Sequence, residues 1–359
     1  MLNKNLIGII TNYIGFQKGI NFEIPFYLPT GRKDREKHLD KLNWYSLSGN
    51  TNIPYQFFEK HISSCEQLGI PDKLNWSELS YNTNIPYQFF EKHISSCEQL
   101  GVPDKLNWSN LSGNTNIPIT FFEKYIDKVD WYWLSGNTNI SVTLFEKHLD
   151  KVNWLGLSKN TNIPFTFFEK YISSCEQLGV PDKLNWFYLS GNTNIPITFF
   201  EKYIDKVDWY WLSGNTNIPV TFFEKHLDSQ SKEMNIKVDW SELSRNTNIP
   251  YQFFEKHISS CEQRGVPDKI NWIMLSRNTN IPYQFFEKHI SSCEQLGVPD
   301  KVYWSYLSGN INIPVTFFEK HLNKEMNIKL DWSELSRNTN IPKHYNLIKL
   351  REILYNYKL

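Results

Sequence analysis

Tryptophans recur along the chain at a few fixed spacings, and this recurrence constrains the fold more than any other feature. Eleven of the 13 tryptophans lie 32, 32, 23, 23, 32, 23, 31, 32, 32 and 28 residues apart. Each opens a full or partial copy of the motif W-x-x-L-S-x-N-T-N-I-P-x-x-F-F-E-K, and the copies differ in the length that follows. Such a period predicts a stack of similar units. The anchors of repeats 1 to 11 are Trp44, Trp76, Trp108, Trp131, Trp154, Trp186, Trp209, Trp240, Trp272, Trp304 and Trp332.

Each repeat carries the signals of two helices. Asp or Asn precedes the anchor in ten of eleven repeats and is a good N-cap for a first helix of about two turns. We expect Gly or Asn at the S-G-N step to end this helix in a left-handed cap, and the N-x-N pair to form left-handed turns. The second helix begins near the I-P step or at the following Thr, as in the capping box Thr120 to Glu123. In long repeats it continues to a glycine such as Gly69.

Two such short helices cannot bury their apolar faces alone, whereas stacked repeats form one continuous core. The sequence therefore predicts an all-α fold, an α-solenoid of eleven two-helix repeats of 23–32 residues with helical caps. The expected parts are an N-terminal cap with a degenerate half-repeat at residues 1–43, the solenoid at 44–342 and a C-terminal capping helix at 343–359. The handedness and curvature of the solenoid stay open.

The composition argues against several classes of function. Lys and Arg number 38, as do Asp and Glu, and the resulting zero net charge argues against a protein that binds nucleic acid through its phosphates. No apolar stretch reaches the roughly 18 residues that a membrane span needs. The apolar run at residues 6–10 lacks a cleavage-like region, so we expect no secretion signal. We expect a protein inside a cell, in the cytoplasm or in a virion, with no membrane partner.

No pattern in the chain indicates an enzyme, because phosphate loops, nucleophile elbows and metalloprotease helices are missing from it. Eight of nine histidines occupy one repeat position, where Tyr replaces them in other repeats, so we expect packing rather than base catalysis. Each of the five cysteines lies in a copy of the S-S-C-E-Q insertion, which five repeats carry. Pairs such as His61 and Cys65 could form zinc sites between repeats. Helices about 10 Å apart argue against this, because zinc ligands converge on one ion. We expect no catalytic residue, no cofactor and no metal.

The two residues after each anchor tryptophan vary most between repeats. They lie off the Trp/Leu face of the first helix, so we expect them to be partly exposed. Aromatic residues, which are common in binding hot spots, gather there in repeats four to seven. Packing of these rings on the neighbouring repeat is the alternative. The predicted protein-binding strip consists of Tyr132, Trp133, Phe187, Tyr188, Tyr210 and Trp211.

The pattern W-x-x-L-S-x-N-x-N-I, followed by D-K-x-[DN]-W, resembles an uncharacterised repeat of giant DNA viruses of amoebae, the mimivirus-like group. The resemblance covers residues 36–342 and includes the P-D-K step at Pro71-Asp72-Lys73. This chain reads N-T-N-I where those repeats often read N-P-N-I. Its richness in Lys, Asn and Ile agrees with an A/T-rich genome. The resemblance implies a viral protein that acts inside a host cell, and it implies no activity.

From these patterns we expect a non-enzymatic scaffold for protein–protein interaction. The sequence gives neither the identity of the partner nor the oligomeric state. One alternative is a helical repeat protein that binds nucleic acid by stacking bases on aromatic side chains. The other is a ubiquitin-ligase substrate adaptor in which Leu6 to Phe16 form a degenerate F-box-like helix.

Overall fold

The structure, a computed structural model, describes residues 42–228, 238–321 and 330–339. These residues form helices and no strands, which confirms the predicted all-α solenoid class. The chain divides into two compact units, Met1–Ile163 and Pro164–Leu359, and the boundary lies inside repeat 5. Almost all of the predicted N-terminal cap at 1–43 and the whole capping helix at 343–359 lie outside the described residues.

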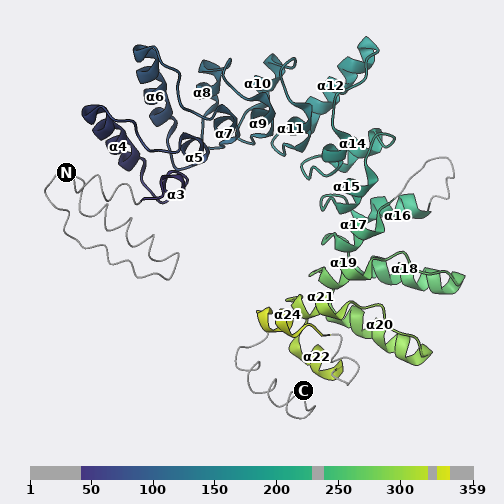
Figure 1. The fold of residues 1–359 in the computed structure, drawn as a ribbon. Helices are drawn as coiled ribbons and strands as arrows, with labels where there is room; N and C mark the ends of the chain where they lie inside the picture. The colour runs from purple at the N-terminus through teal and green to yellow at the C-terminus, as the bar shows by residue number, and fades with distance from the viewer. Residues whose placement is uncertain (1–41, 229–237, 322–329, 340–359) are drawn as a thin grey trace, which may run out of the picture. The chain divides into compact units, whose positions relative to one another are not determined.

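The N-terminal unit consists of a row of short helices, each opened by an anchor tryptophan, beside a second row of helices (Figure 1). Consecutive short helices contact one another along the row. The short helices are α3 (Trp44–Ser48), α5 (Trp76–Tyr81), α7 (Trp108–Gly113), α9 (Trp131–Gly136) and α11 (Trp154–Lys159). The second row is α4 (Tyr55–Leu68), α6 (Tyr87–Leu100), α8 (Ile119–Lys124) and α10 (Val142–Lys147).

The C-terminal unit repeats this arrangement, with contacts between consecutive short helices. The short helices are α13 (Trp186–Ser190), α15 (Trp209–Gly214), α17 (Trp240–Arg245), α19 (Trp272–Arg277), α21 (Trp304–Gly309) and α24 (Trp332–Arg337). The second helices are α12 (Phe165–Leu178), α14 (Ile197–Lys202), α16 (Val220–Asp228), α18 (Tyr251–Arg264), α20 (Tyr283–Leu296) and α22 (Val315–His321).

The short helices begin at the predicted residues because Asn or Asp caps all of them except α21, which follows Tyr303. The Asn75 side-chain oxygen, for example, accepts a hydrogen bond from the Glu78 backbone N–H at 2.9 Å. The backbone N–H of Asn75 donates to the Ser48 hydroxyl of the preceding repeat at 3.0 Å. The cap residue therefore also joins two repeats.

The short helices end differently from the prediction. Asn82 follows α5 with φ −69° and ψ 109°, an extended conformation, and Gly49 follows α3 with φ −83°, so the predicted left-handed caps are wrong. The Asn82 side chain accepts from the Asn84 backbone N–H at 3.0 Å and donates to the Ser48 carbonyl oxygen at 2.9 Å. These two bonds, one of them to the preceding repeat, hold the backbone in the extended conformation.

The second helices begin directly after the proline of the I-P step. Pro118 is the N-cap of α8, so Thr120 lies inside the helix and the alternative start at Thr is wrong. In repeat 4 Ser141 replaces the proline, and its hydroxyl accepts from the Thr143 backbone N–H at 3.4 Å. The long second helices end as predicted, at a glycine in the left-handed conformation, such as Gly69 with φ 62°.

The core of each unit uses the same positions in repeats 1 to 10. The Leu of the short helix, the Ile of the turn and the second Phe of the second helix are fully buried, as Leu79, Ile85 and Phe90 illustrate. The anchor Trp76 stacks on His93, with ring centroids 3.9 Å apart. This repeat therefore contributes one aromatic layer to the core.

A ladder of buried Ser and Asn side chains joins consecutive repeats beside this core. The Asn114 side chain donates to the Ser80 carbonyl oxygen at 3.1 Å and accepts from the Asn116 backbone N–H at 3.0 Å. Because a buried polar group without a partner is costly, these bonds fix how each repeat sits on the preceding one. Equivalent asparagines that donate to the preceding repeat are Asn82, Asn137, Asn160, Asn215, Asn246, Asn278, Asn310 and Asn338.

Candidate protein-binding surface

The N-terminal unit contains two of the six residues predicted for the binding strip. Tyr132 and Trp133 follow the anchor of α9, and 52% and 51% of their surfaces are exposed. Their rings meet edge to face with centroids 5.4 Å apart. The Trp133 indole lies beside Gly113 of α7, where an added Cβ would be 3.5 Å from the indole Cε3 atom. This contact leaves much of the indole open to solvent.

The C-terminal unit contains the other four residues, Phe187 and Tyr188 on α13 and Tyr210 and Trp211 on α15. The Trp211 ring centroid lies 4.8 Å from that of Phe187, 6.1 Å from that of Tyr188 and 5.8 Å from that of Tyr210. Phe187 is 43% exposed and Tyr210 47% exposed, while Tyr188 and Trp211 are half-buried. We call these four residues the C-terminal aromatic cluster.

An internal comparison explains how this cluster forms. Residues 94–140 and 172–218 are identical except at two positions, where Ser109 and Asn110 correspond to Phe187 and Tyr188. Trp133 and Trp211 are thus equivalent residues in matching segments, yet Trp133 is 51% exposed and Trp211 is half-buried. The Phe187 ring covers part of Trp211, whereas a serine in the N-terminal copy covers nothing. Two substitutions in the preceding repeat therefore create the cluster.

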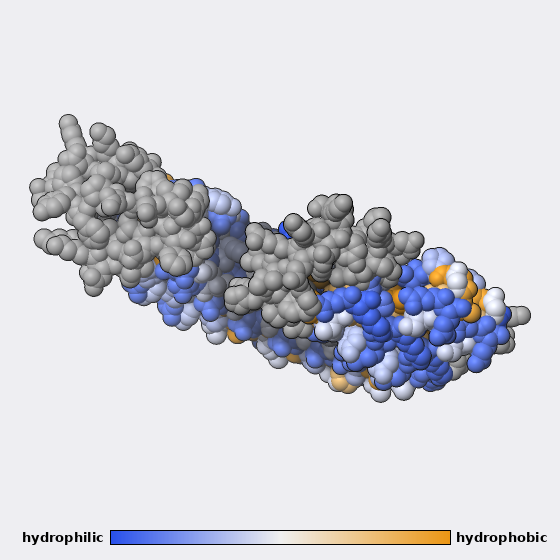
Figure 2. Space-filling model, turned by 90° about the horizontal axis from the view of Figure 1, so that it is seen from below, coloured by the Kyte–Doolittle hydropathy of each residue, from blue (hydrophilic) through white to orange (hydrophobic). Residues whose placement is uncertain are grey.

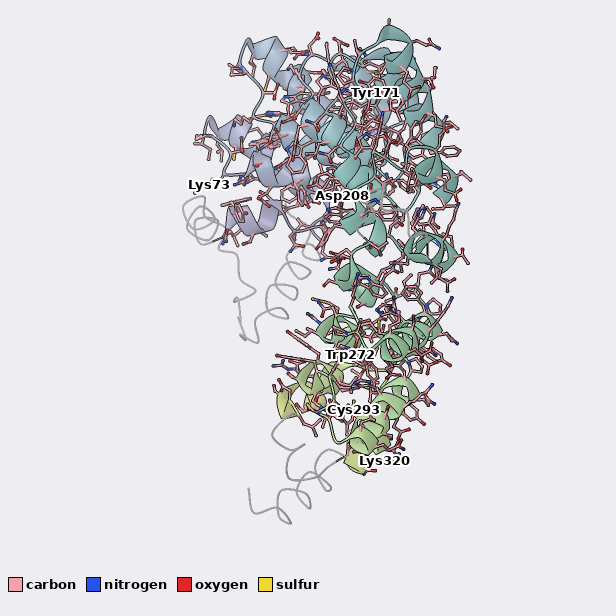
Figure 3. The ribbon with its side chains drawn as sticks, turned by 90° about the vertical axis from the view of Figure 1, so that its right-hand side faces the viewer. Lys73, Tyr171, Asp208, Trp272, Cys293 and Lys320 are labelled. Atoms are coloured by element: carbon pink, nitrogen blue, oxygen red, sulfur yellow. The ribbon has the colours of Figure 1, made fainter. Side chains whose placement is uncertain are left out.

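Asp130 and Asp208 are equivalent residues of the two matching segments, but their hydrogen bonds differ. Asp130 caps α9 by accepting from the Tyr132 backbone N–H at 2.9 Å, and its second carboxylate oxygen accepts from the Ser109 hydroxyl. Asp208, labelled in Figure 3, caps α15 by accepting from the Trp211 backbone N–H at 3.0 Å. Phe187 has no hydroxyl, so Asp208 lacks the second hydrogen bond that Asp130 makes. The second carboxylate oxygen of Asp208 therefore has no hydroxyl donor at the position that Ser109 holds in the other copy.

Further carboxylates border Tyr210. A hydrogen bond between its hydroxyl and Glu242, together with the charge of Glu242, raises the pKa of Tyr210, and Asp239 acts in the same direction. Arg245 has the opposite effect and makes an ion pair with Glu242 at 2.8 Å. Glu242 and Asp239 thus place negative charge beside Tyr210, and Arg245 is paired with Glu242.

The Trp211 indole N–H is buried and has no hydrogen-bond partner among the described residues. A buried donor without an acceptor costs about 1–3 kcal/mol. Because the atom is inaccessible, it cannot itself contact a ligand in this conformation. The packing of the aromatic rings must therefore offset the cost of burying the Trp211 indole N–H.

The sequence prediction missed a second set of exposed apolar residues, at the ends of the long second helices. Leu100, Leu178 and Leu296 are 70% to 76% exposed. Each precedes the left-handed glycine that ends its helix, as Leu100 precedes Gly101. The signal was present in the sequence, since an apolar Leu-Gly-Val step lies between polar residues in these repeats.

Histidine and cysteine make local contacts. The His61 Nε2 atom lies 3.6 Å from the Cys65 sulfur and accepts from the Lys73 backbone N–H at 3.4 Å. Burial lowers the pKa of His61 and raises the pKa of the Cys65 thiol. Across the described ranges, no three His, Cys, Asp or Glu side chains come together as metal ligands would. The His61 side chain therefore connects its helix to the segment that leads to the next repeat.

Hydrophilic residues cover most of the described surface seen in Figure 2, with hydrophobic residues in small groups among them. Among the described helices, none combines the length and the apolar character that crossing a membrane requires. A comparison of the chain with known protein families, with curated proteins and with solved structures finds no match. The fold defines a helical repeat protein.

Proposed function

We propose that this chain is a non-enzymatic repeat scaffold that binds another protein through exposed aromatic residues of its short helices. The contact residues are Tyr132 and Trp133 in the N-terminal unit and the C-terminal aromatic cluster in the other unit. No catalytic residue, cofactor or metal takes part in the proposed function.

The exposure of these rings carries the proposal. At the same positions repeat 3 has Ser109 and Asn110, which shows that a repeat folds without aromatic residues there. Phe187 and Tyr210 nevertheless expose 43% and 47% of their surfaces, in contact with other rings. Rigid aromatic side chains supply much of the binding energy at protein interfaces. Their presence at exposed positions where a repeat folds without them supports a role in binding.

The carboxylates around the cluster favour a protein partner over nucleic acid. Asp208, Asp239 and Glu242 lie next to these rings and would repel phosphate groups. The zero net charge of the chain acts in the same direction. The ubiquitin-ligase adaptor stays a prediction, because Leu6 to Phe16 lie outside the described residues.

The resemblance to giant-virus repeats supports a proposal about the setting. The repeated motif and the lysine-rich composition lead us to propose a viral protein that acts in the host cytoplasm or is carried in the virion. The proposed partner is then a host or viral protein of unknown identity.

Affinity purification of the tagged full chain from infected cells, followed by mass spectrometry, tests this proposal. Two variants replace aromatic pairs with the pair found in repeat 3, namely Phe187→Ser with Tyr188→Asn, and Tyr132→Ser with Trp133→Asn. Leu178→Arg is the control, because Leu178 is 76% exposed and Arg264 occupies the same position in repeat 8.

We expect a protein that the wild type and the Leu178→Arg variant capture and that at least one aromatic variant loses. Circular dichroism checks that all chains keep their helix content. Capture of the same proteins by every variant, or of none above an untagged background, contradicts the proposal. Recovery of nucleic acid with strong salt dependence favours the nucleic-acid alternative.

A further inference from the structure

The chain contains its own example of a cation bound at this repeat position. The guanidinium carbon of Arg277 lies 4.6 Å from the ring centroid of Tyr306. Tyr306 is the second residue after its anchor, which is the position of Trp211 in repeat 7, and Arg277 occupies the position of Gly191 in repeat 6. An aromatic ring at this position thus accepts a guanidinium when the preceding repeat provides one. Gly191 provides no side chain that could do the same for Trp211.

The charges around the cluster favour a cation from outside the chain. Asp208, Asp239 and Glu242 each carry a negative charge, and Arg245 is engaged with Glu242 at 2.8 Å. Two of the three carboxylates therefore have no opposite charge within this group. Aromatic faces and carboxylates together bind guanidinium better than ammonium, because guanidinium is planar, stacks on rings and donates several hydrogen bonds.

We propose that the C-terminal aromatic cluster and Asp208 bind an arginine side chain in an exposed cationic segment of the partner protein. The guanidinium contacts the exposed surface of Phe187 and Tyr210 and donates to the Asp208 oxygen that no serine engages. The inference rests on the proposed function and names the chemistry of the partner. Tyr132 and Trp133 are a weaker site for the same cation, because the Ser109 hydroxyl engages the Asp130 carboxylate and no ring replaces Phe187.

Fluorescence anisotropy of labelled nonaarginine, titrated with the full chain, tests this inference. Nonacitrulline, which keeps the shape of arginine but has no charge, is the control peptide. The variant is Asp208→Asn, and the matched control is Asp130→Asn in the equivalent segment. Asparagine caps several other short helices, such as α5 after Asn75, so both variants keep a helix cap.

We expect the wild type to bind nonaarginine and not nonacitrulline. Loss of one charge-assisted hydrogen bond in Asp208→Asn should weaken binding about tenfold, and Asp130→Asn should weaken it less than about twofold. Equal effects of the two substitutions, no effect of either, binding of nonacitrulline or no binding of nonaarginine would overturn the inference.

The two proposals fail separately. If an aromatic-dependent partner is captured but Asp208→Asn binds nonaarginine as the wild type does, the arginine site is wrong and the scaffold function stands. If no captured protein depends on the aromatic rings, the proposed function itself is wrong, whatever the peptide does.

Discussion

Replacing Asn114 by alanine tests the hydrogen-bonded ladder that joins the repeats. Asn114 is 2% exposed, and its side chain donates to the Ser80 carbonyl oxygen at 3.1 Å and accepts from the Asn116 backbone N–H at 3.0 Å. It also makes a longer bond, of 3.4 Å, to the Asn82 carbonyl oxygen. The substitution removes these bonds and leaves the Ser80 carbonyl buried without that donor.

These contacts set the expected loss in the free energy of unfolding for Asn114→Ala. The two shorter hydrogen bonds contribute about 1 kcal/mol each, and the buried carbonyl left without its donor costs about 1 kcal/mol more. The expected loss for Asn114→Ala is therefore about 3 kcal/mol of the free energy of unfolding, a large share of the roughly 5–15 kcal/mol of a typical domain. Asn116→Ala is the control, because its side chain is exposed two residues away, and it should cost less than about 1 kcal/mol.

Urea unfolding of the full chain, followed by tryptophan fluorescence, measures both variants. Because repeat arrays can unfold in more than one step, the wild type and variants are compared on the same transition. A third variant, Asn114→Asp, keeps the acceptor but places a carboxylate against carbonyl oxygens, and should destabilise at least as much as alanine. If Asn114→Ala is no more destabilising than Asn116→Ala, the ladder does not hold the repeats in register.

Two further predictions concern His93 beside its anchor tryptophan and Gly191 beside Trp211. His93 is half-buried, and this burial lowers its pKa from 6.5, while its Nε2 accepts from the Lys105 backbone N–H. Below pH 6.5 the unfolded chain therefore binds more protons at this position, so its contribution to stability should be full above pH 6.5 and fall as the pH drops below it. His93→Tyr should flatten part of this fall in urea unfolding at pH 7 and pH 5, and an unchanged slope would contradict the assignment. An added Cβ would lie 2.9 Å from the Trp211 indole at Gly191 but 3.5 Å from the Trp133 indole at Gly113. Gly191→Ala should therefore lower the free energy of unfolding by about 1–2 kcal/mol and shift the tryptophan emission. Equal effects of Gly191→Ala and Gly113→Ala would refute the close contact.

Local signals in the sequence were enough to predict the helices. The anchor tryptophans, the Asn or Asp before them and the glycine after each long helix all act within a few residues of the element that they begin or end. Stacking of the repeats followed from the short length of each helix pair. The fold class and the starts of the short helices could therefore be read without the structure.

Contacts between repeats decided what the sequence could not predict. Asparagine is compatible with left-handed and extended backbone, and Asn82 is extended because its side chain bonds to Ser48 in the preceding repeat. Likewise, Trp133 and Trp211 lie in matching sequences, and their different exposure depends on Ser109 or Phe187 one repeat earlier. A pattern read within one repeat does not contain this information.

The dissociation constant of the captured partner for the wild type and for the Phe187→Ser, Tyr188→Asn variant tests the proposed binding surface most directly. The variant has the sequence of repeat 3, which folds with serine and asparagine at these positions, so the core is expected to remain intact. Since a hot-spot aromatic residue contributes about 2 kcal/mol or more, the account predicts at least about thirtyfold weaker binding. A dissociation constant within about twofold of the wild-type value would contradict a binding role for the C-terminal aromatic cluster.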